Sequence, residues 1–198
     1  MMGSYRLIRL LIAIAIVLLT FVSAQATNTL RPKSSPADRE FARATAQISA
    51  VEIAESALAL THTKRGDIHD FAQNLLDERT TTDHRLRQVA SDDSVAISIR
   101  IPKIDRQKID RLSKLYDGDF ERQYVSDEAS AIWSQIMRAS AESRNGTNPG
   151  LQFFATQRLP TLLGDQHMIQ EIAAGATVGV PPPPAPLGWH YQPPSLPY

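Results

Sequence analysis

The chain has 198 residues, with 21 Lys and Arg against 21 Asp and Glu, and it contains no cysteine. The balanced charge excludes the basic surface that nucleic-acid-binding proteins usually need, so no nucleic-acid partner is expected. The lack of cysteine excludes disulfides, thiolate metal sites, thiol nucleophiles and a lipid anchor on an N-terminal cysteine. The length is sufficient for one domain with a hydrophobic core.

Residues 1–26 have the three parts of a secretory signal peptide. Arg6 and Arg9 supply the positive region, and residues 10–22, LLIAIAIVLLTFV, form an apolar run of 13 residues. This run is short for a membrane span, which needs about 20 residues. The AQA at the end of the segment supplies the small residues of a cleavage site. We therefore predict cleavage after Ala26, with an uncleaved N-terminal anchor as the alternative.

Removal of this segment leaves 19 basic and 21 acidic residues, a formal charge near −2. A cysteine-free exported chain is typical of a bacterial envelope protein rather than of a small secreted module held by disulfides. We therefore expect a periplasmic or secreted bacterial protein that has no membrane span once the signal peptide is removed.

The mature chain opens with a flexible lead-in, residues 27–35, before the first predicted helix. Ser35 and Asp38 are spaced as a capping box, and Pro36 stands at the first helical position. These start signals and the apolar residues that follow predict a helix over residues 36–62.

Apolar residues at helical spacing predict three further long helices. They span residues 67–90, 119–143 and 149–174. Pro160 lies inside the last of them, where we expect a bend because proline removes one backbone hydrogen bond of the helix.

The segment between the second and third long helices has a different pattern. Alternate residues from Val95 to Ile101 are branched and apolar, which is the period of a strand. No partner strand is available, so we expect an extended crossover lying on the helices. A short helix follows, with apolar residues at helical spacing: Ile109, Leu112 and Leu115.

Four long helices with one long crossover predict an all-α four-helix bundle over residues 36–175. Residues 176–198 form a separate proline-rich segment, which holds eight of the 13 prolines. Such a composition favours a solvated polyproline backbone, so we expect a disordered tail. Its aromatic residues suggest an alternative, in which the tail binds an envelope protein or cell-wall material. They are Trp189, Tyr191 and Tyr198.

Every predicted long helix carries ionisable residues on its apolar side when residues are placed at about 100° intervals. A buried isolated charge costs several kcal/mol, so such groups must pair, bind a metal or reach water. His84 points away from the apolar side of its helix and is expected on the surface. The predicted core charge network consists of Glu52, Glu55, Glu78, Arg79, Glu121, Glu128, Arg158 and Asp165.

Three interpretations of these charges remain open. In the favoured one, Arg79 and Arg158 neutralise the glutamates in an internal ion-pair network. In the second, the charges flank the core and are solvated. In the third, they form the metal site of an oxidoreductase, although the Glu-x-x-His motif of di-metal bundles is absent from the sequence. The metal ligands would then be Glu52, Glu55, Glu78 and Glu128.

Three segments of the chain resemble the signature segments of a bacterial exported family called domain of unknown function 4142. They are FAQNLLDERTTTDHRL, LSKLYDGDFERQY and FFATQRLPTL, and the resemblance covers roughly residues 38–174. The resemblance implies a ferritin-like four-helix bundle in the envelope, with no established activity.

The chain departs from that family at the positions where members typically carry an Asp-His step and two further histidines. Here these positions hold Glu78 and Arg79, Ile132, and Asp165. Arginine cannot ligate a cation, so a charge pair stands in place of the Asp-His step. We therefore expect no cofactor and no catalysis, in an exported protein with an envelope or stress-related role. A metal-binding bundle and an interaction module acting through its tail are the alternatives.

Overall fold

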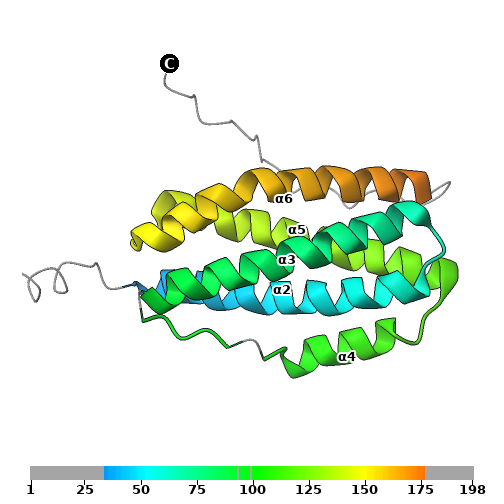
Figure 1. Cartoon of the computed structure of the whole chain (residues 1–198), viewed down its shortest axis with the longest axis horizontal. Helices are drawn as coiled ribbons and strands as arrows, with labels where there is room; N and C mark the ends of the chain where they lie inside the picture. The colour runs from blue at the N-terminus through cyan, green and yellow to red at the C-terminus, as the bar shows by residue number, and fades with distance from the viewer. Residues whose placement is uncertain (1–33, 93, 99, 177–198) are drawn as a thin grey trace, which may run out of the picture.

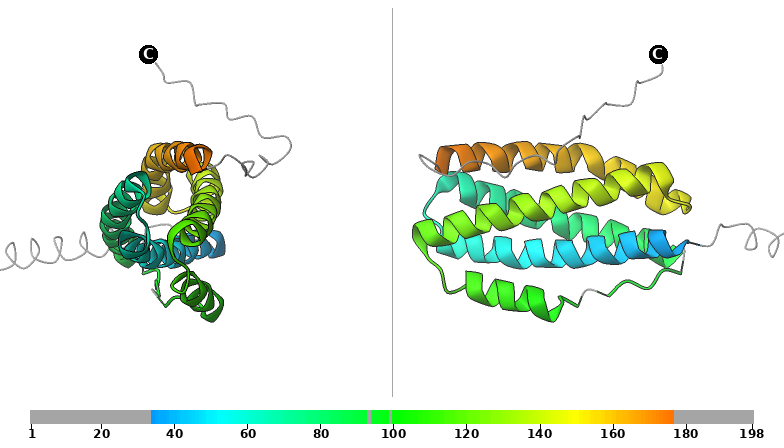
Figure 2. Two further views of the ribbon diagram at one scale, coloured as in Figure 1. Left: turned by 90° about the vertical axis from the view of Figure 1, so that its right-hand side faces the viewer. Right: turned by 180° about the vertical axis from the view of Figure 1, so that it is seen from behind.

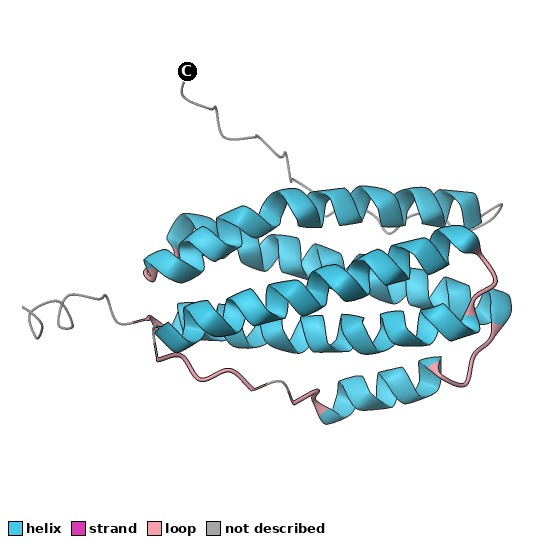
Figure 3. Cartoon of the chain, viewed as in Figure 1, coloured by secondary structure: helices cyan, strands magenta, loops and turns pink. Residues whose placement is uncertain are grey.

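The structure, a computed structural model, describes residues 34–92, 94–98 and 100–176 (Figure 1). All regular secondary structure in these residues is helical, and the connections between helices are loops (Figure 3). The prediction of an all-α chain is therefore confirmed. The helices are α2 (Pro36–His62), α3 (Gly66–Asp92), α4 (Lys103–Leu112), α5 (Asp117–Asn145) and α6 (Pro149–Ala176).

The four long helices have the predicted positions, and each end lies within two residues of its predicted place. The signal peptide, most of the lead-in and the proline-rich tail lie outside the described residues. None of the helices in the described part of the chain is long and apolar enough to span a membrane.

The four long helices pack around a common core, and α4 lies against the outside of this group (Figures 1 and 2). α2 packs against α3 and α5, and α6 packs against the same two helices. Each long helix runs antiparallel to both of its neighbours (Figure 1). The connection from α3 to α5 runs back along the bundle and contains α4 (Figure 1). In this connection, α4 packs against α2 and α5.

The start of α2 has the predicted capping box. The Ser35 hydroxyl accepts a bond of 3.1 Å from the Asp38 backbone N–H, and the Asp38 carboxylate accepts one of 2.6 Å from the Ser35 N–H. Asp38 also accepts a bond of 2.9 Å from the N–H of Thr147, in the turn between α5 and α6. Burial alone raises the pKa of Asp38, but the bonds from Thr147 and Ser35 lower it to about 2. One carboxylate therefore begins α2 and holds it to a distant turn.

Apolar residues at helical spacing along one side of α5 and of α6 are buried. They are Val125, Ile132, Ile136 and Ala139 on α5, and Leu151, Ala155, Leu162 and Ile169 on α6. On α2, Phe41 and Ala59 are buried whereas Ile48 is half-buried. Pro160 lies within α6, and this helix changes direction between its yellow and orange parts in Figure 1, as expected for an internal proline.

The connection before α4 is extended, as predicted, and contains no strand in its described residues. Val95 is buried and Ile97 half-buried, so this segment lies on the bundle with its apolar side inward. On α4 itself Leu112 is buried, whereas Ile109 is half-buried. The crossover is therefore held on the bundle by a few apolar side chains.

We predict that Asp38→Ala lowers the free energy of unfolding by about 2 kcal/mol, and Ser35→Ala by about 1 kcal/mol. Asp38 has the larger effect because it also binds the turn at Thr147. Urea denaturation followed by circular dichroism measures both. Glu40→Ala removes an exposed acid from the same turn of α2 and is the control. Equal losses for Asp38→Ala and Glu40→Ala would contradict the prediction.

Candidate functional site

Arg79 of α3 lies in the centre of the bundle, with 0% of its surface exposed. The helical repeat places it beside Leu75 and Leu86, which are also buried. Its neighbour Glu78 lies at the edge of the core, with 27% of its side chain exposed. A buried guanidinium must find acceptors inside the protein, because an unpaired one would cost several kcal/mol.

Carboxylates from three helices surround the Arg79 guanidinium. Its Nε donates to Glu52 Oε2 at 2.8 Å, and its Nη2 donates to Glu52 Oε1 at 3.3 Å and to Asp165 Oδ2 at 2.9 Å. Its Nη1 donates to Glu78. The planar guanidinium thus binds Glu52 through two parallel bonds, the geometry that suits arginine and carboxylate. Glu52 lies on α2 and Asp165 on α6, so Arg79 joins three of the four long helices.

Arg158 of α6 extends the network to the fourth long helix. Its Nη2 donates to the Gln135 side-chain oxygen at 3.0 Å, and the Gln135 amide donates to both oxygens of Glu52 at 2.7 Å. The Nη1 of Arg158 donates to Glu78 and, at 3.3 Å, to the Thr82 hydroxyl oxygen. The Thr82 hydroxyl donates to Glu78 at 2.7 Å. We call these seven residues the arginine network, namely Glu52, Glu78, Arg79, Thr82, Gln135, Arg158 and Asp165.

Three charged groups of the arginine network, those of Arg79, Arg158 and Asp165, have pKa values shifted by their surroundings. Burial alone lowers the pKa of Arg79, but the charges of Glu52 and Glu78 raise it above its usual range. The pKa of Arg158 is lowered, by burial and by the charge of Arg79. Burial raises the pKa of Asp165 more than its bond to Arg79 lowers it. Arg79 is therefore the group whose charge the network stabilises most.

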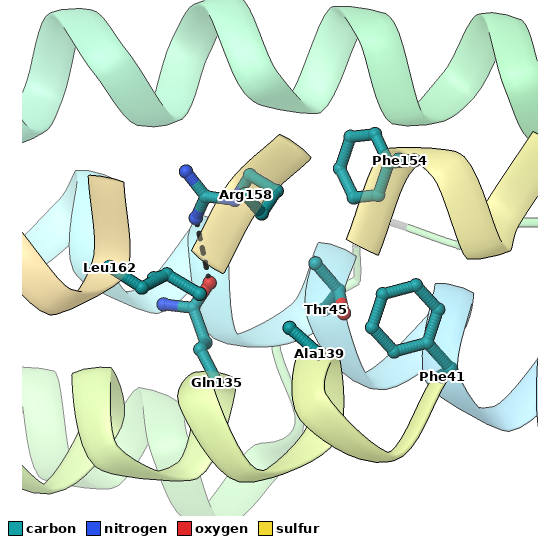
Figure 4. A pocket seen from close by; sticks show the side chains of 7 residues that line it. All are labelled: Phe41, Thr45, Gln135, Ala139, Phe154, Arg158 and Leu162. Atoms are coloured by element: carbon teal, nitrogen blue, oxygen red, sulfur yellow. Dashed lines mark hydrogen bonds between the residues drawn. The ribbon is translucent and has the colours of Figure 1, made fainter. Parts of the chain in front are cut away.

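The arginine network is closed on the side shown in Figure 4. There Phe41 and Phe154 pack edge to face, with ring centroids 6.3 Å apart, next to the bonded pair of Arg158 and Gln135. The narrow space that these side chains enclose with Leu162 leaves no room for a water molecule. A substrate has no access to the arginine network through this space.

A second set of ionisable side chains lies nearer α4, and we call it the acid cluster: Glu55, Lys108, Asp127 and Glu128. Lys108 of α4 places its Nζ 3.7 Å from Glu55 Oε1 and 3.0 Å from Asp127 Oδ1. Glu55 and Glu128 are buried, and neither carboxyl group accepts or donates a hydrogen bond. The acid cluster is therefore only partly neutralised, in contrast to the arginine network.

Burial raises the pKa of both glutamates of the acid cluster. Burial raises the pKa of Glu55 to about 7, although the charge of Lys108 opposes the shift. The pKa of Glu128 is well above its usual range, first because of burial and then because of the charges of Glu52 and Glu55. Burial and the charge of Glu128 also raise the pKa of Tyr124, whose hydroxyl lies 3.2 Å from that of Ser56. Both glutamates are proton-holding groups in the interior.

The structure divides the predicted core charges into three groups. Glu121 lies apart from both sets, since it accepts a bond of 2.8 Å from Thr63 at the end of α2. His84 is exposed, as predicted. Five predicted residues lie in the arginine network, namely Glu52, Glu78, Arg79, Arg158 and Asp165, and two lie in the acid cluster, namely Glu55 and Glu128.

Two central residues are missing from the predicted network. Gln135 binds both Glu52 and Arg158, and its signal in the sequence is a polar residue beside the buried Ile132 and Ile136. Lys108 lies one helical turn before the buried Leu112, so a basic residue on the inner side of α4 is its signal. The pattern within a single helix shows that these residues face inward, but it does not show which carboxylate on another helix each of them binds.

The acidic side chains do not have the spacing of a preformed metal centre. Among the described residues, no three His, Asp or Glu side chains are grouped so that they could hold one metal ion. Three acids of the arginine network are instead bound by guanidinium groups. The four glutamates predicted as possible metal ligands also lie in two separate groups. Glu52 and Glu78 bind Arg79 in the arginine network, whereas Glu55 and Glu128 belong to the acid cluster and do not bind Arg79.

The model of a family described as "Domain of unknown function (DUF4142)" matches residues 23–172. No curated protein matches the chain, and no solved structure does. The matched range includes every residue of the arginine network and of the acid cluster.

We predict that Arg79→Ala lowers the free energy of unfolding by about 3–5 kcal/mol, because it leaves buried carboxylates without a counter-charge. Arg87→Ala is the matched control on the same helix. Arg87 binds Asp83 one turn away in a partly exposed pair, at 2.6 Å, and an i,i+4 pair of this kind contributes about 0.5 kcal/mol. Denaturant unfolding compares the two variants. A loss below about 1 kcal/mol for Arg79→Ala would show that the guanidinium does not hold the core.

We predict that the wild-type chain loses stability as the pH rises from 4.5 to 7. The folded chain binds the Glu55 proton more tightly than the unfolded chain does, since its pKa is raised from 4.5 to about 7. This advantage is complete below pH 4.5 and is lost as the pH rises through 7. Glu55→Gln should reduce the loss between pH 5 and pH 8 by about 3 kcal/mol.

Thermal and urea unfolding of both proteins at pH 5 and pH 8 measures this difference. Glu121→Gln, outside the acid cluster, is the control and should leave the pH dependence of the wild type unchanged. A pH dependence that is identical in the wild type and Glu55→Gln would disprove the assignment.

Proposed function

The chain belongs to the family described as a domain of unknown function (DUF4142), and we propose that it is an exported helical-bundle protein of the bacterial envelope with a structural or binding role rather than a catalytic one. The arginine network carries this proposal. Glu52 and Asp165 are bound to Arg79 inside the core, and Glu78 at its edge is bound to Arg79 and Arg158, so these carboxylates are not free to transfer protons or bind a substrate.

Carboxylates that act as general acids and bases need a free oxygen within hydrogen-bonding reach of the substrate. Both oxygens of Glu52 accept bonds from Arg79 and from Gln135, and Glu52 is fully buried. Asp165 is bound by the same guanidinium and is also buried. Arg79 therefore occupies the place where the carboxylates of three helices converge, and its charge satisfies them permanently. This arrangement suits a rigid protein with a structural or binding role.

The arrangement of the helices supports a ferritin-like bundle as the finer description of this fold. In such bundles two antiparallel helix pairs are joined by one long crossover. Here α2 and α3 form the first pair, α5 and α6 form the second, and the crossover contains α4 (Figure 2).

Export is supported by the N-terminal sequence rather than by the fold. Residues 1–26 combine two arginines, an apolar run too short for a membrane span and a small-residue cleavage site. The absence of cysteine in the chain accords with a bacterial envelope protein that needs no oxidative folding. An envelope or stress-related role is the proposal that follows from this location.

We predict that expression in a bacterium gives a periplasmic product beginning at Thr27, seen by intact-mass spectrometry of the periplasmic fraction. Signal peptidases need a small residue immediately before the cut, so Ala26→Leu should leave the chain uncleaved and attached to the membrane. Ala15→Leu makes the same change inside the apolar run and should be processed normally. Recovery of the wild-type chain at full length in the cytoplasm would refute export.

A further inference from the structure

The acid cluster contains a feature that the arginine network lacks, namely buried carboxyl groups without partners. Glu128 of α5 has 0% exposure and Glu55 of α2 has 1%, and all four of their oxygen atoms lack a hydrogen bond. Buried polar groups in proteins are nearly always hydrogen-bonded, so four such oxygens in one place call for a partner. Two mutually close carboxyl groups on facing helices form a set of oxygen ligands.

The two glutamates lie close to each other and to further negative charge. Besides burial, the charges of Glu52 and Glu55 raise the pKa of Glu128, whereas those of Arg79 and Lys108 lower it. The packing of α2 against α5 explains this proximity, because Glu52 meets Gln135 across the same interface and Ser56 meets Tyr124. The two glutamates lie between these contacts along the two antiparallel helices. The partner that their oxygens lack must therefore be positively charged or a donor.

Lys108 is the only cation whose ion pairs reach the acid cluster in the described part of the chain. Its Nζ is bonded to Asp127 at 3.0 Å and only approaches Glu55, at 3.7 Å. One of the two buried glutamates, Glu128, is left without an ion pair to this lysine. The acid cluster thus has three carboxyl groups and one ammonium group, and the four unbonded oxygens of Glu55 and Glu128 can serve as ligands of a further cation.

A groove leads from the protein surface to Lys108. It lies between α2, α4 and α5, and its polar walls include Asp105, Lys108, Asp127 and Ser130. The side chain of Lys108 is 33% exposed and lines this groove. Lys108 therefore stands between the solvent and Glu55.

We propose that Glu55 and Glu128 together bind one divalent cation that prefers oxygen ligands, and that Lys108 controls its entry from the groove. Carboxylate oxygens suit hard cations such as Mg²⁺, Ca²⁺ and Mn²⁺. Each carboxyl group releases its proton to the solvent when the cation binds, so two protons leave for each divalent cation. The net charge of the buried cluster is then unchanged, which avoids the cost of adding uncompensated charge to the interior. Lys108 keeps its bond to Asp127 on the groove side.

This site differs from a preformed three-acid centre. No three His, Asp or Glu side chains of the described ranges are grouped so that they could hold one metal ion. The proposed set needs only two carboxylates, which offer four oxygens, and it leaves Glu52 bound to Arg79. Cation binding therefore leaves the arginine network intact.

Titration of the chain with Mn²⁺ at pH 8, followed by electron paramagnetic resonance of the free ion, tests the proposal. Cations compete with protons for carboxylates, so an alkaline buffer favours binding. We expect one Mn²⁺ per chain. Glu55→Gln and Glu128→Gln should each weaken binding by more than about ten-fold, because each removes a ligand. Lys108→Gln should tighten it by about ten-fold, because it removes a like charge a few ångströms away.

Glu121→Gln is the matched control, since this glutamate of α5 bonds to Thr63 outside the acid cluster, and it should bind like the wild type. Glutamine keeps the size of glutamate, and circular dichroism checks that every variant stays folded. No bound Mn²⁺ in either the wild type or Lys108→Gln would overturn the proposal. So would binding that survives Glu55→Gln and Glu128→Gln. Unchanged affinity in Lys108→Gln would remove the lysine from the mechanism.

Discussion

The buried guanidinium of Arg79 is the constraint on which the rest of the bundle depends. It has five N–H donors in one plane, and these must meet acceptors inside the protein. The acceptors lie on α2, on α3 itself and on α6, and Gln135 of α5 completes the set by binding Glu52. Because the donors have fixed directions, each helix can supply its acceptor in only one rotation and one axial position. Apolar packing alone tolerates small shifts more easily, so the arginine network specifies how the four helices align.

The core of the bundle accommodates buried acidic side chains in two different ways. In the arginine network, two guanidinium groups and an amide satisfy the carboxylates directly. In the acid cluster, a single lysine lies beside two of the three carboxyl groups, and Glu55 and Glu128 retain protons at a pH where most carboxyl groups are ionised. The arginine network forms a fixed scaffold, whereas the acid cluster leaves carboxyl groups whose protonation depends on the pH of the solvent. The capacity of the core to respond to its surroundings lies in the acid cluster, beneath the α4 crossover.

Much of the fold and part of the site could be predicted from local patterns. The spacing of apolar residues located the four long helices, and the capping box located the start of α2, because these signals involve residues at most a few positions apart. The charges on the inner faces were visible for the same reason. Gln135 and Lys108 were not predicted, because a glutamine between isoleucines or a lysine on a short helix becomes important only when another helix brings a carboxylate to it. Glu121 shows the reverse error, since it shares a face with Glu128 but meets Thr63 beyond the end of α2.

The sequence by itself determined the membership of the family, the helices, the capping box of α2, and the presence of charge on the inner face of every long helix. Hydrophobic periodicity and capping act within one helix, so a single chain segment contains all the information they need. Only the tertiary structure decided which charges meet: Arg79 with Glu52 and Asp165, and Lys108 with Glu55 and Asp127. Electrostatic energy falls off with distance and depends on burial, and both are properties of the packed bundle. For this reason the neutralised and the unneutralised acids could not be told apart before the helices were placed together.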